Sequence, residues 1–468
     1  MRNITLDNVM TMQDVSRTEK IRLVLHMSLP AILAQLTSIA MQYIDAGMVG
    51  SLGAEATASI GLISPVTWLI GSSCIGFSAG FYVQVAHLIG ARRMHRADEV
   101  LRQGLRTVLI AGALICIICL LITDQVPRWL RGPEEIWHDS SAYFFVYSLS
   151  VPFILIRQLS CGMMQSTGDM KTPSVLSAII CLLDVVLNFF LIFPSRHVSL
   201  AGIQILIPGA GLEVRGAAIA TALSEVIISL VALYFIAARN HKISLRGPGS
   251  WKWDRETMTT AARIGIPMAF DQIFICSAYI AGTIIVARLG TVPVAANSLA
   301  ITAESLCYMP GYGIGAAATA IIGQSIGAKR HDLTKSFARV SVGLGMIMMG
   351  IMGVLMYISA PEVFSLLTSS SEVAELGTKV LRIELFAEPL YGASICCAGV
   401  FRGAGDTLAS SIMNLVSMWC VRIIPAIFLV PVLGLTGYWI AMMVELCFRG
   451  TIFLIRMRLG KWMTAIYS

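Results

Sequence analysis

The stretch GMMQSTGDMKTP, residues 162–173, returns in outline as GVFRGAGDTLAS at residues 399–410. Gly162 matches Gly399, and Gly168-Asp169 matches Gly405-Asp406, at a constant offset of 237 residues. The same offset relates further identical residues, namely Pro30 and Pro267, Gln35 and Gln272, Gly76 and Gly313, Gly90 and Gly327, and Pro152 and Pro389. Ungapped agreement over about 140 residues indicates two copies of one structural unit.

The composition indicates that this unit lies in a membrane. Of the 468 residues, 56 % are hydrophobic and only 13 % are charged, whereas soluble domains carry roughly a quarter charged residues. Apolar runs of about 18 residues or more recur along the chain, which is the length that spans a bilayer as a helix. The first 20 residues are polar and lack the apolar core of a signal peptide, so we expect the first apolar run to remain as a helix.

The apolar runs between charged segments predict twelve spans. They lie at 22–50, 55–89, 97–123, 138–165, 172–193, 216–239, 256–287, 291–327, 334–359, 372–402, 408–431 and 434–456. Grouping the termini with every second loop places 23 of the 34 Lys and Arg residues on one side and six on the other. The positive-inside rule therefore predicts that both termini are cytoplasmic.

Because each unit has an even number of spans, six, the second copy begins on the same face of the membrane as the first. We therefore expect an all-α polytopic membrane protein in which two six-helix bundles are parallel repeats, related by a pseudo-two-fold axis along the membrane normal. The expected organisation is an N-terminal segment (1–21), a first bundle (22–239), a linker (240–255), a second bundle (256–456) and a tail (457–468).

The repeat also locates turns and one insertion. Gly90, Gly168, Gly327 and Gly405 end spans, where a left-handed C-cap favours glycine, and Asp169 and Asp406 are expected to cap the helices that follow. Near the end of each unit the offset falls from 237 to 221. The first unit thus carries extra residues near 195–211, which we expect to form an external hairpin.

Four ordered motifs resemble the multidrug and toxic compound extrusion (MATE) transporters. They are DAGMVGSLG at 45–53, GAAIATALSE at 216–225, MPGYGIGAAATAIIGQSIGAKR at 309–330 and CAGVFRGAGDT at 397–407. The stretch AEPLYGASICCAGVFRGAGDT at 387–407 is most similar to the bacterial DinF-like branch. The resemblance implies a multidrug efflux transporter in a bacterial inner membrane.

Polar residues gather at one depth of the first unit. Asp45, Asp184, Asn188 and Thr221 all fall in the outer half of their spans, and Asp184 and Asn188 share a helix face at i and i+4. Oxygen ligands suit a proton or a hard cation such as Na⁺, and the resemblance implies that these residues form the cation-coupling site. MATE transporters usually place the Asn first and the acid four residues later, so the order is inverted here.

The second unit carries acids near the predicted midplane. They are Asp271, Glu304 and Glu388, and Glu384 joins Glu388 at i+4. The resemblance implicates these four acids in a substrate or cation cavity. Arg157, Arg382 and Arg422 also lie within spans, with Arg263 near the inner end of another. Because buried charges are usually paired, we expect these arginines to neutralise acids; contact with anionic lipid or phosphate is the alternative.

These features predict an antiporter that exchanges H⁺ or Na⁺ for small organic, cationic amphipathic compounds. No cofactor and no nucleic-acid partner are expected, membrane lipid is an expected partner, and the protein is expected to act as a monomer. One alternative is a flippase for lipid-linked oligosaccharides or lipids. The other is an integral membrane transferase, which the absence of DDxxD, HEXXH and HxxxxD motifs disfavours.

Overall fold

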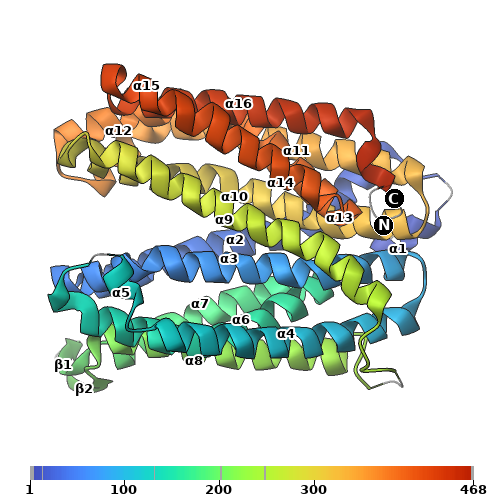
Figure 1. The fold of residues 1–468 in the computed structure, drawn as a ribbon, viewed down its shortest axis with the longest axis horizontal. Helices are drawn as coiled ribbons and strands as arrows, with labels where there is room; N and C mark the ends of the chain where they lie inside the picture. The colour runs from blue at the N-terminus through green and yellow to red at the C-terminus, as the bar shows by residue number, and fades with distance from the viewer. Residues whose placement is uncertain (1–4, 13, 131, 201–202, 247–248, 465–468) are drawn as a thin grey trace.

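Long helices that run along one common direction make up the protein (Figure 1). The computed structural model describes residues 5–12, 14–130, 132–200, 203–246 and 249–464. The residues outside the described ranges are 1–4 and 13 of the predicted N-terminal segment, 131 of the first bundle, 201–202 of the hairpin, 247–248 of the linker and 465–468 of the tail.

The first half of the chain comprises α1 (Leu6–Thr11), α2 (Arg17–Gly50), α3 (Ala54–Gly90), α4 (Met94–Ile122), α5 (Val126–Trp129), η1 (Glu134–Ile136), α6 (Trp137–Ser166), α7 (Lys171–Leu191), β1 (Pro194–Leu200), β2 (Ile203–Ala210), α8 (Glu213–Tyr234) and η2 (Phe235–Arg239). The second half comprises α9 (Arg255–Ala287), α10 (Thr291–Gly327), α11 (His331–Leu367), α12 (Ser371–Glu384), η3 (Leu385–Ala387), α13 (Glu388–Ala404), α14 (Thr407–Val416), η4 (Ser417–Ile423), α15 (Ile424–Leu433), α16 (Leu435–Leu459) and η5 (Lys461–Thr464).

The predicted number of spans is confirmed, because twelve helical segments among the described residues are long and apolar enough to cross a membrane. The first of them, α2, begins at Arg17 rather than at the predicted residue 22. Ser16 and Glu19 form a capping box that starts the helix there. The tenth span is interrupted by η3, where Pro389 follows and cannot donate a helical hydrogen bond.

The helices form the two predicted bundles. In Figure 1, α2 to α8 lie along one side of the molecule and α9 to α16 along the other. The bundles meet where α2 packs against α10 and where α3 packs against α9 and α10. We call the end of the molecule that carries α1 and η5 the termini end, and the end that carries β1 and β2 the hairpin end (Figure 1).

Two glycines bring the bundles into backbone contact at the termini end. A Cβ on Gly90 would overlap the carbonyl oxygen of Gln324, and a Cβ on Gly327 would overlap that of His87. The expectation of left-handed C-caps is therefore wrong for these two glycines, which are helical. Arg92 and Lys329 adopt positive φ in their place.

The two Gly-Asp turns follow the prediction more closely. Gly168 and Gly405 have φ values of +92° and +77°, as expected for C-caps. Asp169 caps the next helix, since its Oδ1 accepts hydrogen bonds from the backbone of Lys171 and Thr172 at 3.1 and 3.0 Å. Asp406 makes no such cap and binds an arginine instead.

The predicted hairpin is confirmed as two antiparallel strands. β1 pairs with β2 from Pro194↔Ala210 to Leu200↔Ile203, with an irregularity between Pro194 and Arg196. Strand pairing satisfies backbone groups that a disordered insertion would leave to solvent. The hairpin lies at the end of the molecule opposite to α1 (Figure 1).

The short helix α1 ties the two halves together. Its Leu6 and Val9 are buried, and Lys242 of the connection between the halves donates to Asp7 at 2.7 Å. Arg330, which follows α10, donates to the carbonyl of Met12 at 2.8 Å. Helix α1 is thus packed against both halves of the chain.

Two side-chain hydrogen bonds cross between the bundles at positions that the repeat makes equivalent. His87 Nε2 donates to the carbonyl of Gly403 at 2.7 Å, and Gln324 Nε2 donates to the carbonyl of Ser166 at 2.7 Å. An offset of 237 relates His87 to Gln324 and Ser166 to Gly403. The pseudo-two-fold axis therefore passes between the bundles.

We predict that His87→Leu destabilises the protein by about 1 to 3 kcal/mol, because the buried Gly403 carbonyl loses a donor. His87→Gln should retain most of the stability, since glutamine supplies the equivalent hydrogen bond in the other half. Thermal unfolding in detergent measures both. Equal loss of stability in the two variants would contradict the role of the hydrogen bond.

Candidate functional site

One amide joins the two carboxylates that were predicted to lie at one depth. Asn188 of α7 donates through Nδ2 to Asp45 Oδ1 of α2 and to Asp184 Oδ2 of its own helix, both at 2.9 Å. Asp184 and Asn188 are fully buried, whereas Asp45 is half-buried. The structure thus brings together three residues from positions far apart in the chain.

Buried oxygen atoms at this site have no hydrogen-bond partner. They are Oδ1 of Asp184 and Oδ1 of Asn188. Thr221 of α8 also interacts with Asp184, and its hydroxyl donates to the carbonyl of Ala217 at 3.2 Å. A buried oxygen left without a donor is costly, so this arrangement suits a proton or a cation that arrives from outside the protein.

The residues available for a metal ion are few. No group of three or more His, Cys, Asp and Glu side chains that could hold a metal occurs within the described ranges. A sodium ion here would therefore need the amide oxygen of Asn188 and the hydroxyl of Thr221 in addition to the carboxylates. Hard cations accept such mixed oxygen ligands.

Small residues on α8 allow the site to assemble. A Cβ on Gly216 would overlap the carbonyl oxygen of Leu191 at the end of α7, and Ala217 and Ala220 are buried. Close approach of helix backbones in a membrane depends on such residues. The motif at 216–225 therefore places Thr221 beside α7.

An ion pair lies one helical turn beyond Thr221. Arg157 of α6 donates through Nε and Nη2 to the two oxygens of Glu225 at 2.6 and 3.0 Å. Arg157 thus neutralises an acid as expected, although Glu225 was not among the predicted residues. The signal was available, because Glu225 stands at the end of the quoted motif GAAIATALSE.

The structure separates Asp271 from the other predicted acids of the second half. Asn414 of α14 donates through Nδ2 to both oxygens of Asp271 at 3.2 Å. This contact repeats the pairing of an amide with a carboxylate seen in the first half. Asn414 was not predicted.

Glu304, Glu384 and Glu388 form a separate group. Both oxygens of Glu384 and of Glu388 are buried without a hydrogen-bond partner. The side chain of Glu388 packs against Gly353 of α11. A Cβ added to Gly353 would lie 3.1 Å from the Cβ of Glu388. Glu384 and Glu388 lie at the junction of α12 and α13 with no exposed surface, and the expectation that they line a cavity stays a prediction.

A second ion cluster lies in the π-helix η4 and α16. Arg422 donates to Glu445 Oε2 at 2.6 Å, Arg449 Nε lies 2.9 Å from Oε1, and Ser417 donates to Oε1 at 2.5 Å. All four residues are buried. Arg422 thus neutralises an acid as expected, although Glu445 was not among the predicted residues.

The two remaining predicted arginines have no acidic partner among the described residues. Arg382 donates to the carbonyl of Tyr357 at 3.1 Å and lies 4.9 Å from the centroid of its ring. Arg263 is exposed on α9 near the termini end.

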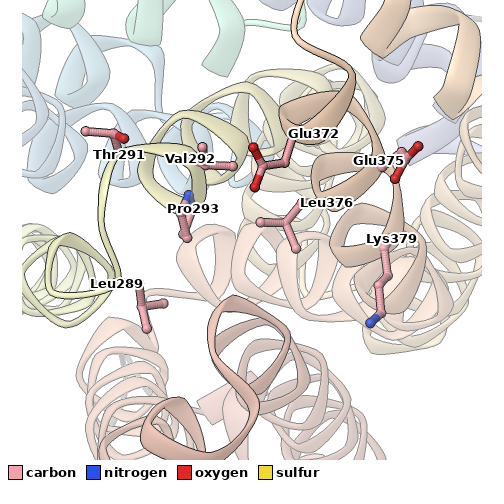
Figure 2. Close-up of a pocket in the computed structure, with 8 residues that line it drawn as sticks. All are labelled: Leu289, Thr291, Val292, Pro293, Glu372, Glu375, Leu376 and Lys379. Carbon is pink, nitrogen blue, oxygen red and sulfur yellow. The ribbon is translucent and has the colours of Figure 1, made fainter.

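A pocket of about 680 Å³ opens at the hairpin end of the second bundle. Figure 2 shows Glu372, Glu375 and Lys379 of α12 on one side, and Thr291 and Pro293 at the start of α10 on the other. None of the predicted site residues lines it. This pocket is therefore distinct from the buried carboxylates.

Comparison with known proteins identifies the family. The MatE profile matches residues 30–190 and again residues 267–428. The chain belongs to the MatE family. The two matches start 237 residues apart (267 − 30), which is the offset of the internal repeat.

Relatives of similar length support this membership. The chain is 24 % identical to the "Probable multidrug resistance protein YoeA" of Bacillus subtilis, covering 88 % of each chain. It is also 24 % identical to the "Probable multidrug resistance protein NorM" of Thermotoga maritima, covering 93 % of this chain and 92 % of the relative. The assignment to the DinF-like branch stays a prediction.

A solved structure confirms the fold. The "outward-facing conformation of a multidrug resistance MATE family transporter of the MOP superfamily" superposes with a TM-score of 0.87 at 22 % identity, and covers 96 % of this chain and 97 % of that chain. Together with its twelve apolar helices, this makes the MatE protein a multi-pass membrane protein.

We predict that Arg157→Leu destabilises the protein by roughly 3 kcal/mol, because Glu225 is left as a half-buried, unpaired charge. The double variant Arg157→Leu/Glu225→Leu should recover most of that loss. Chemical unfolding in detergent micelles measures the difference. If the double variant is as unstable as the single variant, the ion pair is not what stabilises this part of the bundle.

Proposed function

We propose that this MatE-family protein exports organic compounds in exchange for an inward-moving cation, H⁺ or Na⁺. The observation that carries the proposal is the bridge from Asn188 to both Asp45 and Asp184. A carboxylate within a membrane costs roughly 2.5 to 3.5 kcal/mol, and no arginine or lysine of the described residues forms an ion pair with these two acids. A bound cation or proton offsets that cost.

The relatives support a multidrug substrate range, since those compared carry multidrug resistance names. We infer that the transported compounds are organic, cationic and amphipathic, because the first bundle presents two acids without a basic partner. The membrane potential would drive the coupling ion inward with about 2.3 kcal/mol per charge per 100 mV.

Alternating access between the two bundles is the mechanism we infer. The bundles touch through backbone atoms at the termini end. This close contact suits a rocking motion of the bundles that exposes the interior first to one side and then to the other. We place the termini end in the cytoplasm of a bacterial inner membrane, following the charge distribution.

The flippase alternative is disfavoured by the arginines. Arg157 and Arg422 are held by Glu225 and Glu445, so they are not available to bind an anionic headgroup inside the bundles. We further infer that the protein is a transporter and not a transferase, because the matched family and its relatives carry transporter or resistance names.

We predict that Asp45→Asn and Asp184→Asn each reduce ion-driven efflux to the level of protein-free liposomes, because each removes one carboxylate of the cation site. Transport by purified protein in proteoliposomes, under separately imposed proton and sodium gradients, tests this and identifies the coupling ion. Glu362→Gln, an exposed position on α11, is the matched control and should transport normally. Unchanged efflux in both Asp variants would refute the proposed site.

A second prediction concerns the inverted order of the acid and the amide. The double variant Asp184→Asn/Asn188→Asp keeps the charge on the same helix face and should transport faster than Asp184→Asn alone. The assay is the same proteoliposome efflux measurement. If the double variant is as inactive as the single variant, the position of the charge, and not only its presence, is required.

A further inference from the structure

Helix α1 (Leu6–Thr11) lies at the termini end and precedes the first of the membrane-spanning segments (Figure 1). Helices this short are not stable on their own in water, so the surface beneath α1 must hold its conformation. Neither the proposed cation site nor the predicted acids of the second half include any of its residues. The position of α1 therefore depends on how the helices beneath it are arranged.

The buried face of α1 packs where the two halves meet. Leu6 and Val9 lie three residues apart on this face, with 5 and 1 % of their surfaces exposed. They belong to one buried apolar cluster with Met170 of the first half and with Ile326 and Phe337 of the second half. Both halves therefore contribute to the apolar surface that covers α1.

Hydrogen bonds attach α1 to each half separately. Lys242 Nζ donates to Asp7 of α1 at 2.7 Å, and to the carbonyl of Thr167 at the end of α6 at 2.6 Å. On the other side, Arg330 Nη1 donates to the carbonyl of Met12, the C-cap of α1, at 2.8 Å. Helix α1 thus bridges the α6–α7 turn of the first half and the α10–α11 turn of the second half.

This bridge lies beside a hydrogen bond that joins the bundles. Gln324 of α10 donates to the carbonyl of Ser166 at the end of α6 at 2.7 Å. Leu6 packs against Gly168, two residues beyond Ser166, where an added Cβ would lie 3.6 Å from Leu6 Cδ2. Separation of the bundles at the termini end would move Ser166 away from Gln324. Since α1 cannot follow both halves, it must then leave at least one of them.

We propose that α1 is a latch that holds the bundles together at the termini end and thereby sets the fraction of molecules that are open at that end. The inference rests on the proposed function, because alternating access requires the termini end to open. Contacts that exist only in the closed arrangement stabilise it relative to the open one. Exposure of one buried aliphatic side chain changes such an equilibrium roughly tenfold or more.

The latch is weak enough to open during a transport cycle. Leu6 and Val9 are the two buried side chains of α1, and Asp7, which pairs with Lys242, has 53 % of its side chain exposed. Exposed ion pairs contribute little stability. The latch therefore shifts the equilibrium between the closed and open arrangements without locking the transporter in one of them.

Distances between spin labels on the two halves of the full-length protein test the proposal. Labels attached at His95→Cys and Lys335→Cys, both exposed at the termini end, report its opening. A Cys420→Ser background removes the exposed native cysteine. We expect Leu6→Asn/Val9→Asn to raise the ratio of open to closed molecules about tenfold or more, because the buried face of α1 becomes polar.

Two further variants separate release of the latch from unfolding. Lys242→Met leaves the buried face of α1 intact and removes the hydrogen bonds to Asp7 and Thr167, so it should raise the ratio about threefold. Thr11→Ala is the matched control, because Thr11 is exposed and its hydroxyl donates within α1, to the carbonyl of Asn8. The ratio in Thr11→Ala should equal that of the wild type.

An unchanged ratio in both Leu6→Asn/Val9→Asn and Lys242→Met would overturn the latch, and so would an equal rise in Thr11→Ala. Efflux from proteoliposomes, measured with the same variants, distinguishes these outcomes from failure of the proposed function. Normal efflux with an unchanged ratio refutes the latch alone. A raised ratio in the latch variants, together with no efflux by the wild type, supports the latch and refutes the proposed function.

Discussion

The backbone contact between the two halves at the termini end is the constraint on which the rest of the structure depends. The carbonyl groups of Gln324 and His87 pack closely against Gly90 and Gly327 of the opposite half. The side chains of His87 and Gln324 also donate hydrogen bonds across this contact. Apolar helices gain little from burial when lipid is the alternative, so close packing and hydrogen bonds must hold the halves together. The repeat provides the close packing and the hydrogen bond twice, at positions related by the pseudo-two-fold axis.

Pairing of charges explains most of the polar residues within the spans. Arg157 with Glu225 and Arg422 with Glu445 form neutralised pairs, which lowers the cost of placing charge in a membrane. Asp45 and Asp184 share an amide and have no basic partner, and Glu384 and Glu388 have no hydrogen-bond partner. Of the acids that pairing does not explain, Asp45 and Asp184 are the two to which we assign the coupling cation.

The repeat, the number of spans and the common depth of Asp45, Asp184 and Asn188 could be predicted from the sequence, because they depend on periodicity and on the distance along a helix. The partners of buried charges could not, since helix rotation decides them and twelve helices offer many pairings. The pairings of Arg157 with Glu225 and of Arg422 with Glu445 were missed for this reason, although the motif at 216–225 contains Glu225. Gly90 was assigned to a turn because its conformational freedom is visible in a sequence, whereas a helix crossing is visible only in the fold.

The two halves have diverged at the positions to which we assign coupling. Asp45 corresponds to Gly282 in the repeat, and a Cβ on Gly282 would overlap the hydroxyl of Tyr438. Tyr438 thus occupies the space in which the first half holds a carboxylate. Since the second half has filled this space with an aromatic ring and neutralised Glu445 with two arginines, the duplicated scaffold retains an unneutralised pair of carboxylates bridged by an amide in its first half. This asymmetry is the reason for assigning the coupling cation to the first bundle.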